Sequence, residues 1–227
     1  MSFAVQAGKK SAEPRGNLHS RTRRLRLNSG GVFFVESLKS FTSTASIVPS
    51  SRFLTSALLR PINFDKARVI IELGIGTGAI TMELLRRMRP DATLYGIEIN
   101  PVFVSHMRER VHDSRFVPIL AGAERLGSIL KQRGIQRAHA IVSSLGLTSM
   151  VHDQRCSIVR QAAIHLDDQG VLTQYQYLHA KGQPNWSCAL GIKRFAEEFF
   201  LRQYFREVVS EHVIWNLPPA AVYTCRP

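Results

Sequence analysis

Glycines occupy alternate positions in residues 72–78, Glu-Leu-Gly-Ile-Gly-Thr-Gly, and a second acid, Glu98, follows twenty residues after the last of them. Because glycine has no Cβ, such a backbone can turn tightly and a ligand can approach it closely. A carboxylate about twenty residues further on, at the end of the next strand, can accept both hydroxyls of a ribose. The spacing therefore predicts a crevice that binds a nucleoside.

The acid in front of the glycines narrows the kind of nucleoside. A dinucleotide site holds an anionic pyrophosphate at a helix N-terminus. Glu72 would repel that pyrophosphate, whereas it suits a ligand that carries an ammonium and a sulfonium. A dinucleotide-binding or purely structural version of the same crevice remains the alternative.

Strands and helices must bring these residues to one edge, and the chain alternates between the two from residue 68 onward. Short apolar or β-branched runs predict strands, and amphipathic stretches between them predict helices. We expect strands at 67–74, 93–98, 116–120, 140–144, 170–178, 206–216 and 221–225, and helices at 78–88, from 100, at 122–133, 151–165 and 192–204. This order predicts an α/β three-layer sandwich with a mostly parallel sheet. Leu217-Pro218-Pro219 would join the last two strands as a C-terminal antiparallel hairpin.

The composition indicates one globular domain with a charged extension. The 227 residues include 30 basic and 17 acidic ones, a net charge of +13 that predicts attraction to nucleic acid or to an anionic membrane. Residues 1–30 are basic and poor in apolar side chains, so we expect a flexible arm there. Residues 31–62 would form a helical segment for membrane or substrate contact, and residues 63–227 the sandwich domain. The three cysteines lack CxxC spacing, which favours reduced thiols in the cytoplasm, and no histidine pattern supports a metal site.

An amphipathic helix is expected at about 32–42, directly after the basic arm. Phe34, Leu38 and Phe41 recur at the i, i+4, i+7 spacing of one helix face. A basic arm followed by an aromatic-bearing helix is typical of segments that lie in a membrane interface. Packing of this helix on the domain is the alternative. No apolar run reaches the roughly 18 residues that a spanning helix needs.

The E-x-G-x-G-x-G form and the IEIN segment at residues 97–100 resemble the class I S-adenosylmethionine-dependent methyltransferases. The resemblance implies that S-adenosylmethionine is the cofactor and S-adenosylhomocysteine the product. It places Glu72 near the amino-acid end of the cofactor and Glu98 on the ribose. The other residues it places along the cofactor are Gly74, Ile75, Gly76, Thr77, Gly78, Ile99, Gly122, Ala123 and Ser143.

One departure from that family concerns the third strand. Many members end it in Gly-Asp-Ala, whose Asp addresses adenine, whereas this chain has Ala121-Gly122-Ala123. Either Glu124, two positions along, or backbone N–H groups and apolar stacking would then have to recognise the adenine.

Four further segments resemble the bacterial phospholipid N-methyltransferases, and with the glycine motif the resemblance covers about residues 32–225. They are FTSTASIVPSSRFL at 41–54, SSLGL at 143–147, TQYQY at 173–177 and VIWNLPPAAVY at 213–223. The resemblance implies stepwise conversion of phosphatidylethanolamine to phosphatidylcholine. Gly146 stands where that family commonly has proline, and a looser loop there could shift the preference towards another amino lipid.

The chemistry of such an acceptor suggests roles for three groups of residues. A phosphate needs hydroxyl or guanidinium donors, which Ser50, Ser51 and Arg52 supply, and Phe41 is a further candidate for contact with the substrate. Serines before a helix also serve as N-caps, which is the alternative. Ser143 and Ser144 would orient the amine whose lone pair must align with the sulfonium methyl. Tyr175 and Tyr177 alternate along a strand and so share one face, either a pocket wall or plain core. No residue is identified as the general base, and water would suffice.

Two other functions compete with this interpretation. An rRNA adenine N6-dimethyltransferase would share the sheet and the basic charge, but its loop after the fourth strand carries an Asn and a base-stacking aromatic that SSLGL lacks. A catalytically silent membrane-binding module would not need the Glu72-to-Glu98 spacing. We therefore expect an enzyme at the inner face of the cell membrane, peripherally bound, with an anionic lipid surface and an ethanolamine phospholipid as partners, no metal and no nucleic acid. Another amino lipid or a small amine remains an alternative acceptor.

Overall fold

The computed structural model describes residue 1, residues 49–178 and residues 192–227. The arm at 1–30, the helix at 32–42 and Phe41 lie outside the described residues, so their predicted roles stay predictions. None of the described helices is long and apolar enough to span a membrane.

A single seven-stranded sheet forms the middle layer, in the order β3-β2-β1-β4-β5-β7-β6. The first five strands pair in parallel, and β7 runs antiparallel to both of its neighbours. The strands are β1 (Val69–Leu73), β2 (Thr93–Glu98), β3 (Phe116–Leu120), β4 (Ala138–Ser143), β5 (Leu166–Tyr177), β6 (Glu207–Val213) and β7 (Ala220–Arg226). The predicted fold class, including the C-terminal hairpin, is confirmed.

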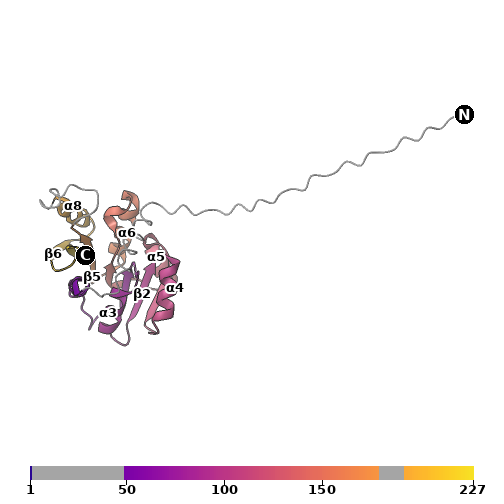
Figure 1. Cartoon of the computed structure of the whole chain (residues 1–227), viewed down its shortest axis with the longest axis horizontal. Helices are drawn as coiled ribbons and strands as arrows, with labels where there is room; N and C mark the ends of the chain where they lie inside the picture. Colours follow the sequence, from indigo (N-terminus) through magenta and orange to yellow (C-terminus); the bar gives the residue numbers. More distant parts are fainter. Residues whose placement is uncertain (2–48, 179–191) are drawn as a thin grey trace.

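Helices cover both faces of the sheet, and each face has its own apolar core (Figure 1). One core is built with α2 (Pro49–Leu59), α3 (Ala79–Arg87) and α4 (Pro101–Arg110). The other core is built with α5 (Leu126–Gln132), α6 (His152–His165) and α8 (Ile192–Leu201). Strands buried on both faces need apolar residues at nearly every position, which explains runs such as Val-Ile-Ile in β1.

The helix α2 packs on the last three strands of the chain, β5, β6 and β7. Leu58 and Leu59 are fully buried in the same core as Val213 of β6 and Val222 of β7. Arg60, just after the helix, pairs with Glu211 of β6. The described part of the predicted 31–62 segment is therefore integrated into the sandwich.

Local sequence signals explain where α4 begins. The side chain of Asn100 accepts a hydrogen bond from the Val102 N–H at 2.9 Å, which caps α4, and Pro101 follows at the first helical position, where its missing N–H leaves no gap.

The observed bounds differ from the sequence prediction at several places. The predicted helix at 122–133 is a 3₁₀ turn, η1 (Ala123–Arg125), followed by α5, a common way for a helix to begin. A second 3₁₀ turn, η2 (Leu147–Ser149), precedes α6. Strand β5 starts at Leu166 instead of 170, with a register shift against β4 between Ala138 and Ala140. Strand β6 ends at Val213 instead of 216, because the chain turns there towards β7.

Candidate active site

The segments singled out in the sequence meet at the carboxyl edge of the parallel strands. Leu73 of β1 lies opposite Ser143 of β4, and the next residue, Ser144, donates its N–H to the Leu73 carbonyl at 2.9 Å. Gly74 donates its N–H to the Ile97 carbonyl at 2.8 Å, which ties the glycine loop to β2. In open α/β sheets this edge is where ligands bind.

The three motif glycines all have positive φ, but their surroundings differ. A Cβ on Gly74 would lie 3.2 Å from Cδ2 of Leu145, and a Cβ on Gly78 would lie 2.6 Å from the Cε of Met107. A Cβ on Gly76 would meet no described atom within 4 Å. Gly74 and Gly78 therefore face side chains of the protein, whereas Gly76 borders open space into which a ligand can come close.

The carboxylate of Glu98 is buried and already takes part in the loop. One oxygen accepts a hydrogen bond from the Gly76 N–H at 3.1 Å, and the other accepts one from the Asn100 N–H at 2.9 Å. Each carboxylate oxygen has a second lone pair, so Glu98 can hold the loop and still accept ribose hydroxyls. The role predicted for it stays a proposal, and the loop contact adds a positioning role that the sequence did not reveal.

Glu72 is fully buried on the sheet face covered by α3. Thr81 donates its hydroxyl to one carboxylate oxygen at 2.7 Å, while Oε1 meets no hydrogen-bond partner among the described residues. Burial raises the pKa of Glu72 to about 8, the Thr81 bond partly opposes that rise, and the negative charge of Glu98 adds to it. A buried carboxylate with one unsatisfied oxygen suits a cationic donor such as the ammonium of S-adenosylmethionine. The residues present thus fit that cofactor.

At the end of β3, where many members of the family have Asp, the side chain of Glu124 lies beside Gly122. Gly122 is buried, and the carboxylate of Glu124 folds back into the place where a Cβ on residue 122 would lie. Glu124 itself is exposed and Ala123 is buried. Of the other residues placed along the cofactor, Ile75 is buried, Thr77 is half-buried and Ile99 is exposed.

The two serines after β4 differ in their hydrogen bonding. Ser143 accepts a long hydrogen bond from the Leu145 N–H, at 3.4 Å. The hydroxyl of Ser144 is buried and finds no partner within the described ranges. Gln174, which was not predicted as a site residue, supports this loop. Its side-chain amide donates to the carbonyls of Leu145 and Tyr175, both at 2.8 Å. A polar amide within an otherwise buried strand was the available signal.

Tyr175 and Tyr177 lie together on the face that α2 and α3 cover, the face to which Glu72 also belongs. Their ring centroids are 5.3 Å apart at an interplanar angle of 74°. Burial raises the pKa of both tyrosines above its usual value. Both hydroxyls therefore stay protonated at neutral pH, where they can donate hydrogen bonds but cannot act as bases.

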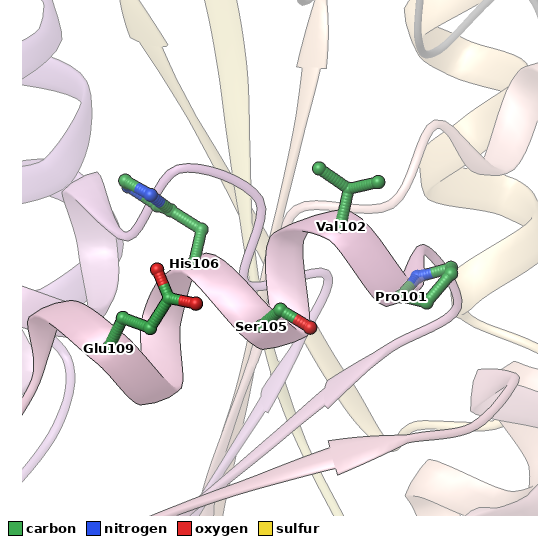
Figure 2. Close-up of a pocket in the computed structure, with 5 residues that line it drawn as sticks. All are labelled: Pro101, Val102, Ser105, His106 and Glu109. Atoms are coloured by element: carbon green, nitrogen blue, oxygen red, sulfur yellow. The ribbon is translucent and has the colours of Figure 1, made fainter.

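The remaining candidates lie at the start of α2. Ser50 and Ser51 fall in the first turn of α2, which begins at Pro49, and Arg52 is exposed there. Figure 2 shows a shallow hollow on the outer side of α4, lined by Pro101, Val102, Ser105, His106 and Glu109. It contains none of the residues selected from the sequence. Among the described residues no three His, Cys, Asp or Glu side chains gather as they would around a metal ion.

Solved structures share this fold across most of the chain. A 1,6-didemethyltoxoflavin-N1-methyltransferase from Burkholderia thailandensis, bound to S-adenosylhomocysteine, superposes with a TM-score of 0.61 at 14% identity, over 86% of this chain and 85% of that one. Human N-acetylserotonin methyltransferase, in complex with S-adenosylmethionine, has a TM-score of 0.58 at 12% identity, over 85% of this chain and 55% of that one. At such identities the likeness shows the fold alone.

Curated proteins of two kinds are similar in sequence, and no protein-family model matches the chain. An ornithine lipid N-methyltransferase from Singulisphaera acidiphila is 32% identical over 196 residues, 86% of this chain and 94% of that protein. A ribosomal RNA small subunit methyltransferase H from Bifidobacterium animalis subsp. lactis is 26% identical over 163 residues, 68% of this chain but 45% of that protein.

The fold and the glycine-loop site define a class I methyltransferase whose cofactor is S-adenosylmethionine, as predicted. Within that class, the chain belongs to the family of the ornithine lipid N-methyltransferase, which it matches over almost the whole length of that enzyme.

Proposed function

We propose that this protein transfers methyl groups from S-adenosylmethionine to a lipid amine, and that the amine is the ethanolamine head group of phosphatidylethanolamine and its methylated intermediates. The observation that carries the lipid acceptor is the 32% identity over 94% of an enzyme named for N-methylation of a lipid. The PSSR and WNLPPAAVY segments, which resemble the phospholipid N-methyltransferases, support ethanolamine as the head group.

Unsatisfied acceptors near the candidate site suit an amine. Of the buried side-chain atoms that lack a hydrogen-bond partner in the described ranges, five are oxygens from the carboxyl-terminal parts of β1, β4 and β5. They belong to Glu72, whose free oxygen suits the cofactor's ammonium, to Ser144 directly after β4, and to Thr173, Gln174 and Gln176 of β5. Thr173 shares the sheet face of the two tyrosines, and Gln174 and Gln176 point to the opposite face, so Ser144 and Thr173 are the acceptors left for an acceptor amine. An unsatisfied buried acceptor is costly, and a ligand rich in N–H donors relieves that cost. An ammonium group is such a ligand.

The reaction needs alignment more than it needs an acid or a base. The head group arrives as an ammonium and must release a proton to water before its nitrogen can attack. Glu72 and Glu98 would hold S-adenosylmethionine, which would supply an electrophilic methyl on a sulfonium; as the nitrogen takes that methyl, the sulfur would keep the electron pair of the broken C–S bond. We expect Ser143 and Ser144 to orient the nitrogen and the Tyr175–Tyr177 pair to form the wall beside it, since aromatic faces attract cations.

The phosphate and the membrane would be engaged by the N-terminal part of the chain. Ser50, Ser51 and Arg52 would hold the phosphate, and Phe41 would contact the apolar part of the lipid. The arm at 1–30 would be drawn to an anionic surface, where each basic residue close to the lipid contributes about 1 kcal/mol. The protein would then act at the inner face of the cell membrane, on the cytoplasmic side, and bind it peripherally.

Expression in a bacterium whose membranes contain phosphatidylethanolamine but no methylated derivative tests this proposal. We expect mono-, di- or trimethylated phosphatidylethanolamine in the lipid extract, identified by mass spectrometry, and none with an empty vector. If the host lipids remain unmethylated while an added ornithine lipid pathway yields methylated ornithine lipid, the ethanolamine assignment is wrong and the lipid amine assignment stands.

A further inference from the structure

The turn between β6 and β7 exposes three large apolar side chains. Ile214, Trp215 and Leu217 are 65%, 74% and 76% exposed, the last two among the highest values for large apolar residues in the described chain. We call residues 214–219 the β6–β7 tip. Exposed apolar side chains that occur singly are common, but a contiguous group of this kind marks an interaction surface.

The tip is held in place by its own hydrogen bonds. The side chain of Asn216 is buried, and its amide donates to the Pro218 carbonyl at 2.6 Å. At the base of the tip, the Leu178 N–H donates to the Pro219 carbonyl at 2.9 Å, while Val213 and Ala220 are buried in the core. The apolar side chains are therefore presented by a fixed turn.

The strand register places the tip at the same edge of the sheet as the candidate active site, the edge at which β4 and β5 end. Strand β4 ends at Ser143, which lies opposite Gln174 of β5. Strand β5 continues for three more residues to Tyr177, which pairs with Ala220 at the base of the tip. At about 3.3 Å per residue, the tip starts roughly 10 Å beyond the edge at which β4 ends. It projects past the site, next to the two tyrosines.

We propose that the β6–β7 tip enters the interfacial layer of a lipid bilayer and so places the head group at the end of β4 and β5. The proposal rests on the proposed lipid acceptor. Trp is enriched where membrane meets water, because its ring is apolar and its N–H is polar, and aliphatic neighbours such as Ile214 and Leu217 add apolar contact. The net charge of +13 favours an anionic bilayer over a basic partner.

The size of the surface argues against a second copy of the chain as the occupant. A stable protein interface buries about 800 Å² on each partner, more than three side chains can supply. A bilayer needs no such area, since a few inserted side chains and several basic residues bind it reversibly.

The test uses the full-length protein and vesicles of phosphatidylethanolamine with phosphatidylglycerol. The chain has two tryptophans, so the Trp186→Phe variant reports on Trp215 alone. We expect its emission to shift to the blue and to be quenched by brominated lipids. A double variant, Trp215→Ser with Leu217→Ser, should lose about tenfold in vesicle affinity even at high salt, where the contribution of basic residues is screened.

A control variant replaces the same number of exposed apolar side chains with serine, at positions outside the tip. Ile164→Ser with Val209→Ser changes two residues that are 55% and 53% exposed on α6 and β6, away from the tip. This control should bind vesicles like the wild type. Both double variants should bind S-adenosylhomocysteine normally and methylate a short-chain acceptor dispersed in detergent at the wild-type rate.

Three results would overturn the proposal: no quenching of Trp215 at saturating vesicles, equal vesicle binding by the two double variants, or a lipid-free dimer that the tip variant dissociates. The last result would assign the tip to a second copy of the chain. Because quenching is read without turnover, a protein that inserts the tip but methylates no lipid would refute the proposed function and leave the tip assignment intact.

Discussion

Replacing Gly76 with valine is expected to lower the affinity for S-adenosylmethionine by at least about 100-fold while the sheet stays folded. A Cβ at residue 76 points into space that no described atom fills, so the branched side chain would stand where the ligand must approach. The same residue donates its N–H to Glu98, so a shift of the loop would also move the carboxylate expected on the ribose.

Gly134→Val is the matched control for backbone strain. Gly134 also has positive φ, +68° against +49° for Gly76, and a Cβ there also meets no described atom within 4 Å, but it lies in the turn after α5. Both variants should lose about 1–2 kcal/mol of stability from the left-handed backbone. Titration calorimetry with S-adenosylhomocysteine separates the two: an equal affinity in both variants would mean that Gly76 does not border the cofactor.

Glu72→Gln is expected to weaken cofactor binding and to remove its dependence on pH. With a pKa of about 8, Glu72 is protonated in the ligand-free protein at neutral pH and must ionise to meet an ammonium. Affinity for S-adenosylhomocysteine should therefore rise as the pH rises from 6 towards 8, by at most tenfold per pH unit. Glutamine cannot ionise and offers the ammonium no negative charge, so its affinity should be low at every pH.

The same substitution should stabilise the ligand-free protein in alkali. The native pKa of Glu72 lies above the ordinary value of 4.5, so the native state binds more protons than the unfolded state between those values. Stability from this group is then complete below about pH 4.5 and is lost as the pH rises through 8, by a few kcal/mol in order of magnitude. Glutamine does not titrate, so urea unfolding at pH 6 and pH 9 should show Glu72→Gln gaining on the wild type.

Glu83→Gln on α3 serves as the control for this prediction. Hydrogen bonds from Arg86 and Arg87 lower the pKa of Glu83 to about 2, so its titration lies far below this range. Its substitution should leave the pH dependence of binding between 6 and 8 unchanged. A wild-type affinity that is flat with pH, or a Glu72→Gln protein that binds like the wild type, would contradict the assignment of Glu72 to the ammonium.

The parts of the structure that local sequence determines were predictable. Apolar runs gave the strands of the sheet, and the Glu72-to-Glu98 spacing led to two acids that the structure indeed places near one loop. What depends on contacts between distant segments was not predictable. The side chain that faces Gly78 comes from Met107, and the one that faces Gly74 comes from Leu145, 29 and 71 residues away. The loop contact of Gln174 likewise exists only once β4 and β5 pair.

Strand β5 and the β6–β7 tip show the same limit. Alternation along β5 predicts that Tyr175 and Tyr177 share a face, but only the packed structure shows that this face is the one occupied by Glu72 and α3. The apolar tip was present in the sequence as Ile-Trp-Asn-Leu, within a segment predicted to be partly strand. Its exposure follows from the end of β6 at Val213 and from the buried Asn216, which the sequence pattern alone does not reveal.

Transfer of a methyl group from S-adenosylmethionine to a lipid amine can be measured directly with the purified protein and a radiolabelled cofactor. Methyl-labelled cofactor would be incubated in parallel with vesicles containing phosphatidylethanolamine, with vesicles containing ornithine lipid and with unmodified ribosomal RNA, using Gly76→Val as the inactive control. We expect label in the lipid extract of an amine-bearing vesicle and none in the RNA. Label in the RNA with both lipids unlabelled would contradict the account.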